Sequence, residues 1–230
     1  MFLSVIIPVF NEVNTIDEIV ERVLNTNCKF KQIIIVDDNS SDGTREKLEK
    51  YKNRDLFKVI HHNQNSGKGA CIKTATEFLL GDYVIIQDAD LEYNPNDYER
   101  FLKLAEEKKC DAIYGSRVTG NNYKNLNLFR IFRIFANFFL TFLSNIINQQ
   151  KITDAHTCYK FIRIDLFKSL NLSTDDFAIC PEITTKLSKL GVKIFEIPIS
   201  YNGRTFEEGK KIKLKDAFKA VYALIKFRFF

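Results

Sequence analysis

Short apolar segments alternate with amphipathic segments through the first half of the chain. Five of the apolar segments are typical of β-strands: residues 3–10, 31–38, 57–62, 82–90 and 111–116. The intervening segments, such as 14–25, repeat apolar residues at helical spacing, which predicts amphipathic helices. Strands that are apolar on both faces need cover on both faces, as in a parallel sheet between two layers of helices. The sequence therefore predicts an α/β fold with a Rossmann-like, mostly parallel sheet and helices on both faces.

Length, charge and cysteine usage narrow the class of protein. The 230 residues suit one large domain. A net charge of +5 without a dense basic block does not indicate a nucleic-acid partner. The five cysteines are scattered and lack CxxC spacing, which favours reduced thiols in the cytoplasm over disulfides or a zinc site. The apolar N-terminal run is too short for a signal peptide.

Three acidic residues follow the strand expected at 82–90. In an extended segment Asp88, Asp90 and Glu92 share one face, because side chains alternate with a period of two. They lie at the carboxyl end of a parallel strand, where open α/β sheets bind ligands. Carboxylates held together favour a divalent cation, and oxygen ligands favour Mg²⁺ or Mn²⁺. A solvated acidic loop is the alternative.

The segment VDDNSSDGT also follows an apolar strand. Asp37 or Asp38 suits a hydrogen bond to a ribose hydroxyl or a base N–H, and Asp42 suits the cap of the following helix. We assign Asp38 to the ligand and Asp42 to the cap.

The segment NSGKGA is not a phosphate loop of the Walker type. That pattern requires Gly at position 62 and Ser or Thr at position 69, but the chain has His62 and Gly69. Lys68 is expected at a helix N-terminus, where it suits either a phosphate contact or an ordinary surface position.

Two later segments stand out by charge and by polarity. Residues 202–213 interleave Arg204, Lys210 and Lys211 with glycines, which is typical of a basic lid over an anion or of a solvated linker. The expected helix at about 128–148 is apolar except for one narrow polar stripe at residues 130, 133, 137, 141, 144 and 148. Its uninterrupted apolar stretches are too short to span a membrane.

The ordered motifs VIIPVFNE, VDDNSSDGT, DADLEY, YGSR, TCYK and EIPISYNGRTFEEGKKI resemble those of a known family. The chain resembles the family-2 glycosyltransferases of GT-A fold, and among them the dolichyl-phosphate or polyprenyl-phosphate hexose (mannose or glucose) synthases. The resemblance covers nearly the whole chain. It implies one domain, 1–230, with a nucleotide-sugar-binding half at 1–117 and an acceptor-side half at 118–230.

The resemblance implies an inverting transfer of a hexose from a UDP- or GDP-linked donor to a lipid phosphate, with Mg²⁺ or Mn²⁺ on the diphosphate. Its expected donor-binding residues are Pro8, Phe10, Glu12, Val36, Asp38, Asp88 and Ala89, to which we add Lys68 from its place at a helix N-terminus. Asp90 is the expected metal ligand, with Asp88 and Glu92 beside it. Arg204 and Lys210 are expected to hold the donor diphosphate, and Arg117 the acceptor phosphate. Phe10 departs from the Tyr common in the family, and Glu92 stands where many relatives have Gln.

The resemblance implies a role in membrane contact for the helix at 128–148. An enzyme acting on a polyprenyl chain works at the bilayer surface, where an amphipathic aromatic helix can lie, with Arg130 and Arg133 near the lipid phosphate. A helix packed on the sheet, or in a homodimer interface, is the alternative. We expect peripheral attachment to the inner face of the membrane.

Other functions use the same residues differently. A glycan or glycolipid hydroxyl acceptor requires a general base, for which Asp154 is the candidate; otherwise Asp154 suits the acceptor side. A nucleotidyltransferase shares the α/β layout and the metal. A non-catalytic nucleotide-sugar-binding protein does not need the acids beside a basic segment. We expect structural roles for His61, His62 and His156.

Overall fold

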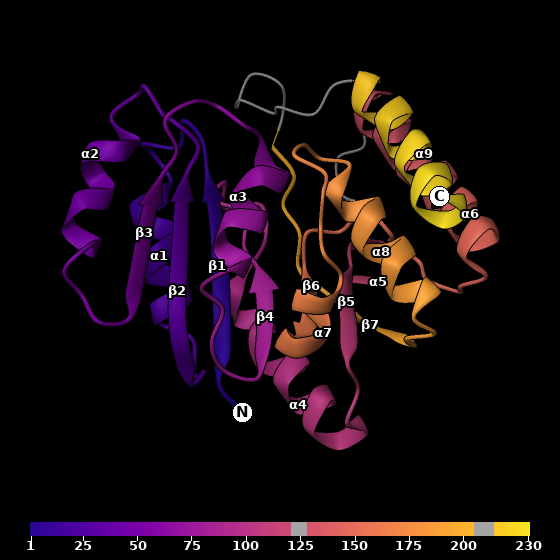
Figure 1. Cartoon of the computed structure of the whole chain (residues 1–230), viewed down its shortest axis with the longest axis horizontal. Coiled ribbons are helices and arrows are strands. Elements are labelled where there is room, and N and C mark those ends of the chain that lie inside the picture. Colours follow the sequence, from indigo (N-terminus) through magenta and orange to yellow (C-terminus); the bar gives the residue numbers. More distant parts are fainter. Residues whose placement is uncertain (121–127, 205–213) are drawn as a thin grey trace.

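The computed structural model describes residues 1–120, 128–204 and 214–230; for residues 128–133 and 214–216 it describes the helices but not the side chains. These residues form a seven-stranded sheet with helices on both faces (Figure 1). Its strands are β1 (Leu3–Val9), β2 (Phe30–Asp37), β3 (Phe57–His61), β4 (Tyr83–Ile86), β5 (Ala112–Ser116), β6 (Lys160–Arg163) and β7 (Ile194–Pro198).

The strand order is β3-β2-β1-β4-β6-β5-β7. Every neighbouring pair is parallel except those of β6, which runs antiparallel to both β4 and β5. The predicted mostly parallel α/β sheet is therefore confirmed. The strands β1, β2 and β4 are parallel neighbours, so the segments that follow them emerge at one edge of the sheet, at the top of Figure 1.

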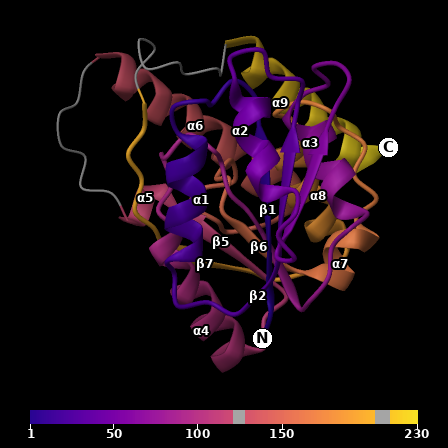
Figure 2. The same ribbon diagram turned by 90° about the vertical axis from the view of Figure 1, so that its left-hand side faces the viewer.

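Helices cover both faces of the sheet. Figure 2 shows α1 (Ile16–Leu24) and α4 (Tyr98–Lys108) on one side of the strands, and α3 (Lys68–Thr76), α7 (Ile164–Ser169) and α8 (Ile179–Lys189) on the other. The apolar face of α1 is buried through Ile16, Ile19, Val20 and Val23, as its helical spacing predicts. Short helices α2 (Thr44–Leu48) and α5 (Arg117–Gly120), with 3₁₀ turns at Glu49–Tyr51 and Pro95–Asp97, complete this part.

The expected long helix is α6 (Leu128–Asn148), which packs beside the last helix, α9 (Leu214–Phe229). Its polar stripe faces inward: Thr141, Ser144 and Asn148 are buried. Hydrogen bonds hold most of these groups: the Thr141 hydroxyl accepts the Ala155 amide at 3.2 Å, and the Asn148 side-chain N–H donates to Thr185 at 3.2 Å. The Asn148 side-chain oxygen is buried without a hydrogen-bond partner among the described residues. The helix is packed on the domain by its polar side.

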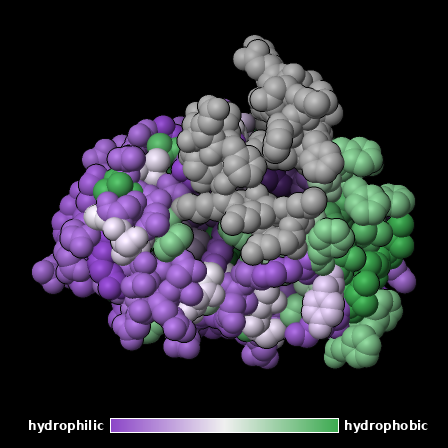
Figure 3. Space-filling model, turned by 90° about the horizontal axis from the view of Figure 1, so that it is seen from above, coloured by the Kyte–Doolittle hydropathy of each residue, from purple (hydrophilic) through white to green (hydrophobic). Residues whose placement is uncertain are grey.

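The inward stripe leaves the apolar side of α6 on the surface, where it continues onto α9. We call this surface the outer apolar face; it appears as the green region on the right of Figure 3. All of its residues are 44–73% exposed. They are Phe135, Phe138, Phe139, Phe142 and Ile146 of α6 with Phe218, Tyr222, Ile225 and Phe229 of α9. In the described ranges no helix combines the length and the hydropathy that crossing a bilayer requires.

Gly67, in the turn that leads into α3, lies so close to the backbone of Asp175 that a side chain at this position should destabilise the fold. Its φ is +99°, and a Cβ at this position would collide with the backbone carbonyl of Asp175. We expect Gly67→Ala to lower the free energy of unfolding by about 2–4 kcal/mol, because backbone strain and overpacking combine. Urea denaturation followed by circular dichroism measures the change.

Gly191→Ala is the matched control. Its φ is +70°, but nothing lies within 4 Å of the added Cβ, so only backbone strain of about 1 kcal/mol is expected. Equal losses in the two variants would show that the close approach of residue 175 does not matter.

Candidate active site

Four carboxylates and two cations meet at the carboxyl edge of the sheet. Glu12 follows β1, and Asp88, Asp90 and Glu92 follow β4. Lys68 opens α3, and Arg204 follows β7. The parallel order of β1 and β4 brings the two acidic segments together, since their ends lie at the same edge.

Arg204 connects three of these acids. Its guanidinium forms a two-pronged pair with Glu12, at 2.9 and 3.1 Å, and lies 3.2 Å from a carboxylate oxygen of Asp90. Its backbone N–H donates to Glu92 at 2.7 Å. Arg204, the first basic residue of the 202–213 segment, therefore lies against the acidic cluster. It is also the last residue of that segment that the structure describes.

Asp90 has a strongly raised pKa. Burial, followed by the neighbouring charges of Asp88 and Glu92, raises its pKa to about 7, although the Arg204 guanidinium opposes the shift. A carboxyl group that is costly to ionise in the protein alone is one that an additional cation would favour in its charged form.

Asp88 has a protein cation as its partner. Its carboxylate pairs with the ammonium of Lys68, which also contacts the Cys158 sulfur at 3.3 Å. The Lys68 side chain is only 14% exposed. Lys68 therefore lies beside the acidic cluster with its charge facing Asp88, and its expected contact with the donor stays a prediction.

The expectation that residues 88–92 are extended is wrong. The strand β4 ends at Ile86, and Leu91 has a φ of +62°, so the chain turns and the three acids do not share one face. The two carboxylate oxygens of Glu92 accept hydrogen bonds from the Tyr201 hydroxyl and the Arg204 amide, both at 2.7 Å. In this arrangement Glu92 anchors the chain after β7, and its role as a metal ligand is less well supported than that of Asp90.

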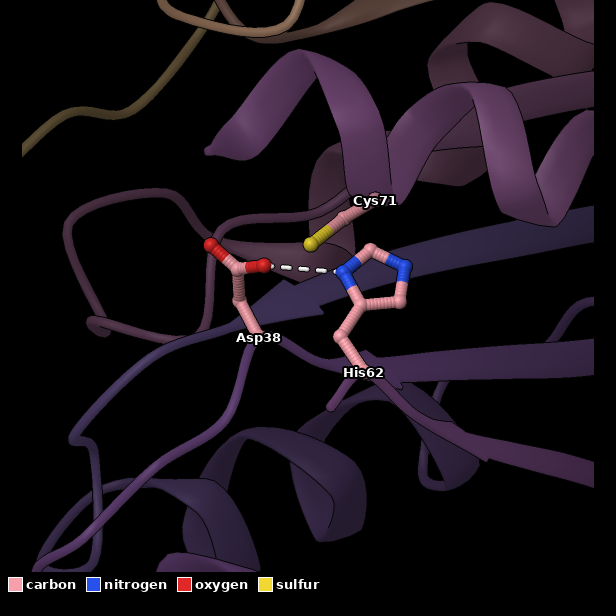
Figure 4. Close-up of side chains that lie close together, drawn as sticks. All are labelled: Asp38, His62 and Cys71. Carbon is pink, nitrogen blue, oxygen red and sulfur yellow. Dashed lines mark hydrogen bonds and ion pairs between the residues drawn. The ribbon is translucent and has the colours of Figure 1, made fainter. Parts of the chain in front are cut away.

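Asp38 lies at the centre of a separate network (Figure 4). Its carboxylate accepts hydrogen bonds from the amides of Ser66 and Gly67 at 2.9 and 2.7 Å, and is 2.8 Å from His62 Nδ1. Within the described ranges, Asp38, His62 and Cys71 are also the one trio whose ligand atoms lie within 4.8 Å of one another. Burial and the Asp38 charge raise the pKa of Cys71, so its sulfur is a neutral thiol at neutral pH.

These contacts give Asp38 a structural task, namely holding the loop before α3. Only 3% of the residue is exposed, so its predicted contact with a nucleoside stays a prediction. The expected cap is wrong by one residue: Gly43 is the N-cap residue of α2, and the Asp42 carboxylate, one position earlier, accepts the Thr44 amide at 3.0 Å.

An open pocket of about 440 Å³ adjoins the cluster. Among the residues expected at the donor, Glu12, Asp90 and Arg204 line it, together with Asn11, Asn202 and Asp42. Pro8 and Phe10 lie half-buried at the end of β1. Val36 and Ala89 are packed in the core, so their side chains do not reach the pocket.

Arg117 and Asp154, both expected on the acceptor side, are paired with each other. The guanidinium donates to the carboxylate at 2.6 and 2.8 Å, and the Arg117 backbone N–H adds a third bond at 3.1 Å. Asp154 is fully buried, and Asn137 of α6 donates to it at 3.3 Å. Burial by itself raises the pKa of Asp154, but the pair with Arg117 outweighs it and holds the pKa below its ordinary value.

Asp154 therefore does not suit the role of general base. A base must accept a proton near neutral pH, and a buried carboxylate bonded to a guanidinium resists protonation. His156 also has a pKa lowered by burial, to about 4, which keeps its ring neutral.

Some expected residues lie outside the described residues. Lys210 and Lys211 fall in 205–213, and the side chains of Arg130 and Arg133 in 128–133.

Two tyrosines of the site were not singled out in the sequence. Tyr201 bonds Glu92 and lies under the Arg117 guanidinium, 5.2 Å from ring centroid to Cζ, while the Tyr93 hydroxyl accepts the Cys158 amide at 3.0 Å. Their positions within the DADLEY and SYNGR motifs were the only available signal.

The fold of the chain is the GT-A fold of glycosyltransferases. The glucosyl-3-phosphoglycerate synthase of Mycobacterium tuberculosis, solved with Mn²⁺, uridine diphosphate and phosphoglyceric acid, aligns with a TM-score of 0.73 and 14% identity, over 99% of this chain and 78% of that one. The model of "Glycosyl transferase family 2" matches residues 4–170. The chain belongs to glycosyl transferase family 2.

Two named relatives match along almost the whole chain. A dolichyl-phosphate beta-glucosyltransferase of Trichomonas vaginalis is 27% identical, over 100% of this chain and 74% of its own length. A dodecaprenyl-phosphate galacturonate synthase of Rhizobium johnstonii is 24% identical, over 99% and 67%. The resemblance to polyprenyl-phosphate sugar synthases is thereby confirmed.

The Arg117–Asp154 pair predicts strong energetic coupling. We expect Arg117→Ala and Asp154→Ala each to lower the free energy of unfolding by about 3–5 kcal/mol, because each leaves a buried charge without its partner. The double variant should lose clearly less than the sum. Since the folded-state pKa of Asp154 is depressed, the coupling should be present above pH 3.8 and fade as the pH falls through the folded pKa.

Urea denaturation at pH 7 of the four proteins in this cycle gives the coupling energy. Additive losses would show that the two side chains act independently, and would reopen the assignment of Asp154 as a base.

Proposed function

We propose that the protein transfers a hexose, with inversion, from a UDP- or GDP-linked sugar to a polyprenyl or dolichyl phosphate at the membrane surface. Membership of glycosyl transferase family 2 and the likeness to lipid-phosphate sugar synthases support this proposal. The observation that carries it is the cluster of Glu12, Asp90 and Arg204 along an open pocket at the carboxyl edge of the sheet.

The donor set of this cluster fits a divalent metal. Carboxylate oxygens are the ligands that Mg²⁺ and Mn²⁺ prefer, and the half-buried Asp90 lies among like charges that one protein cation offsets only in part. Asp90, with Asp88 beside it, would hold the ion. When bound, the ion would supply charge neutralisation to the diphosphate that leaves. The Mn²⁺ and uridine diphosphate in the mycobacterial structure support this assignment.

Arg204 would exchange partners when the donor binds. Its guanidinium now rests on Glu12 and Asp90, and a diphosphate entering the pocket presents a stronger anion to it. A cation at this position stabilises the negative charge that develops on the leaving diphosphate.

The pairing of Asp154 favours a phosphate acceptor over a hydroxyl. A lipid phosphate arrives with an anionic oxygen that attacks without losing a proton, whereas a hydroxyl needs a base. Asp154, the candidate base, is bonded to Arg117 and has a lowered pKa. Arg117 is at the same time the expected contact of the acceptor phosphate.

The outer apolar face supports work at a bilayer. Its phenylalanines are 49–66% exposed on α6, and no described element covers them (Figure 3). Contiguous apolar surface of this kind marks an interaction site. A homodimer through the same face is the alternative occupant.

The decisive test offers the purified protein separate radiolabelled UDP- and GDP-hexoses with Mn²⁺ and a short polyprenyl phosphate. We expect label from one donor to enter the organic phase as a lipid-linked sugar. In Asp90→Ala the transfer should fall by at least about 100-fold, because the expected metal ligand is removed while the fold is kept.

Asp55→Ala, in an exposed loop before β3, is the matched control and should keep wild-type turnover. Wild-type turnover in Asp90→Ala would refute the metal assignment. Label transferred only to a water-soluble glycan would refute the lipid acceptor.

The membrane assignment predicts a separate defect. Phe135→Glu/Phe139→Glu places two charges on the outer apolar face, so vesicle binding should weaken by at least about tenfold while donor binding is unchanged. Vesicle co-sedimentation and donor titration measure the two effects.

The control is Phe2→Glu/Phe78→Glu, which alters two exposed phenylalanines outside α6 and α9. Unchanged vesicle affinity in Phe135→Glu/Phe139→Glu, together with loss of a dimer in sedimentation equilibrium, would assign the face to self-association instead.

A further inference from the structure

A second pocket, of about 500 Å³, lies where the ends of α7, α8 and α9 meet. It shares no lining residue with the pocket beside Asp90. Three lysines line it, Lys186, Lys189 and Lys226, and much of the remaining wall is apolar, with Leu190, Phe227 and Phe230. The pocket thus combines positive charge with hydrocarbon surface.

Only one of the three ammonium groups is neutralised in the described part of the chain. Lys186 pairs with the buried Glu182 at 2.7 Å and donates to the Asn171 carbonyl at 2.7 Å. No described carboxylate pairs with Lys189 or Lys226, and both lysines are exposed. The pocket therefore has an excess of positive charge, which favours an anion as its occupant.

The helix dipole accounts for the position of Lys189 and of Lys226 on its own helix, but not for the fact that both lysines line one pocket. Lys189 ends α8, and Lys226 is in the last turn of α9, where a cation complements the helix dipole. The two helices come from separate parts of the chain, and their lysines nevertheless line the same hollow. Like charges in one pocket repel each other, and an anion between them relieves that repulsion.

The pocket adjoins the outer apolar face. Phe230 lines the pocket and is 96% exposed, and its neighbour Phe229 belongs to that face. Leu190, on the α8 side, is 56% exposed. An occupant with a phosphate at the lysines and hydrocarbon beside Phe230 would match both the charge and the apolar wall.

We propose that this pocket binds the phosphate head group of an anionic phospholipid while the outer apolar face rests on the bilayer. This inference rests on the membrane docking proposed above and adds a lipid preference to it. Lysines near an anionic membrane surface each strengthen binding by a few-fold, and two in one pocket by about tenfold or more. The preference should weaken as salt rises.

The test compares Lys189→Gln/Lys226→Gln with the wild type on vesicles of phosphatidylcholine, with and without phosphatidylglycerol. We expect the wild type to bind the anionic vesicles about tenfold more tightly than the neutral ones. The double variant should lose most of that preference and its salt dependence, while keeping its affinity for neutral vesicles and its thermal midpoint.

Lys103→Gln/Lys108→Gln is the charge-matched control. Both lysines are exposed on α4, at the far end of the molecule from α9 (Figures 1 and 2). It should keep the anionic preference; an equal loss in both variants would show that net charge, and not the pocket, is responsible.

The remaining outcomes separate this inference from the docking that it assumes. Binding of the wild type to neutral vesicles without any anionic preference would overturn the lipid site and leave the docking intact. Absence of binding to every vesicle would overturn both. A thermal shift with inorganic phosphate that is lost in Lys189→Gln/Lys226→Gln, without an anionic vesicle preference, would assign the pocket to a soluble anion.

Discussion

Carboxylates crowded at the carboxyl edge of the sheet are the constraint on which the site depends. Asp88 and Asp90 follow one strand and Glu12 follows its parallel neighbour, so the topology forces them together. Lys68 offsets Asp88, and Arg204 is shared between Glu12 and Asp90. Burial and the charges of Asp88 and Glu92 nevertheless raise the pKa of Asp90 to about 7. A site in this state favours a ligand that brings further positive charge.

The sheet was predictable because its strands are apolar on both faces, and the helices because their apolar residues recur at helical spacing. Two strands were not among the five expected ones, the last strand, β7, and the antiparallel strand β6. Its four residues, Lys160–Arg163, carry no alternation strong enough to show direction or place in the sheet. Pairing between β4 and β6 joins residues about eighty positions apart, and no local pattern specifies such a contact.

The residue types of the site were predictable, but their partners were not. The motifs identified Asp38, Asp90, Arg117 and Arg204. The sequence pattern assumed an extended chain after β4, whereas the left-handed Leu91 turns it, which sends Glu92 toward the chain after β7. Polar pairs across such separations depend on the packed fold, and a resemblance transfers a residue's identity without transferring its neighbours.

The inward polar stripe of α6 is linked by side-chain contacts to the acidic turn after β4. Asn137 on that stripe bonds Asp154, which holds Arg117. The Arg117 guanidinium lies over Tyr201, whose hydroxyl bonds Glu92 in the acidic turn. Because the polar side of the helix is committed to this network, its phenylalanines have no place in the core and remain outside. The same packing that orders Arg117 therefore creates the outer apolar face, so a change in the position of α6 would alter both together.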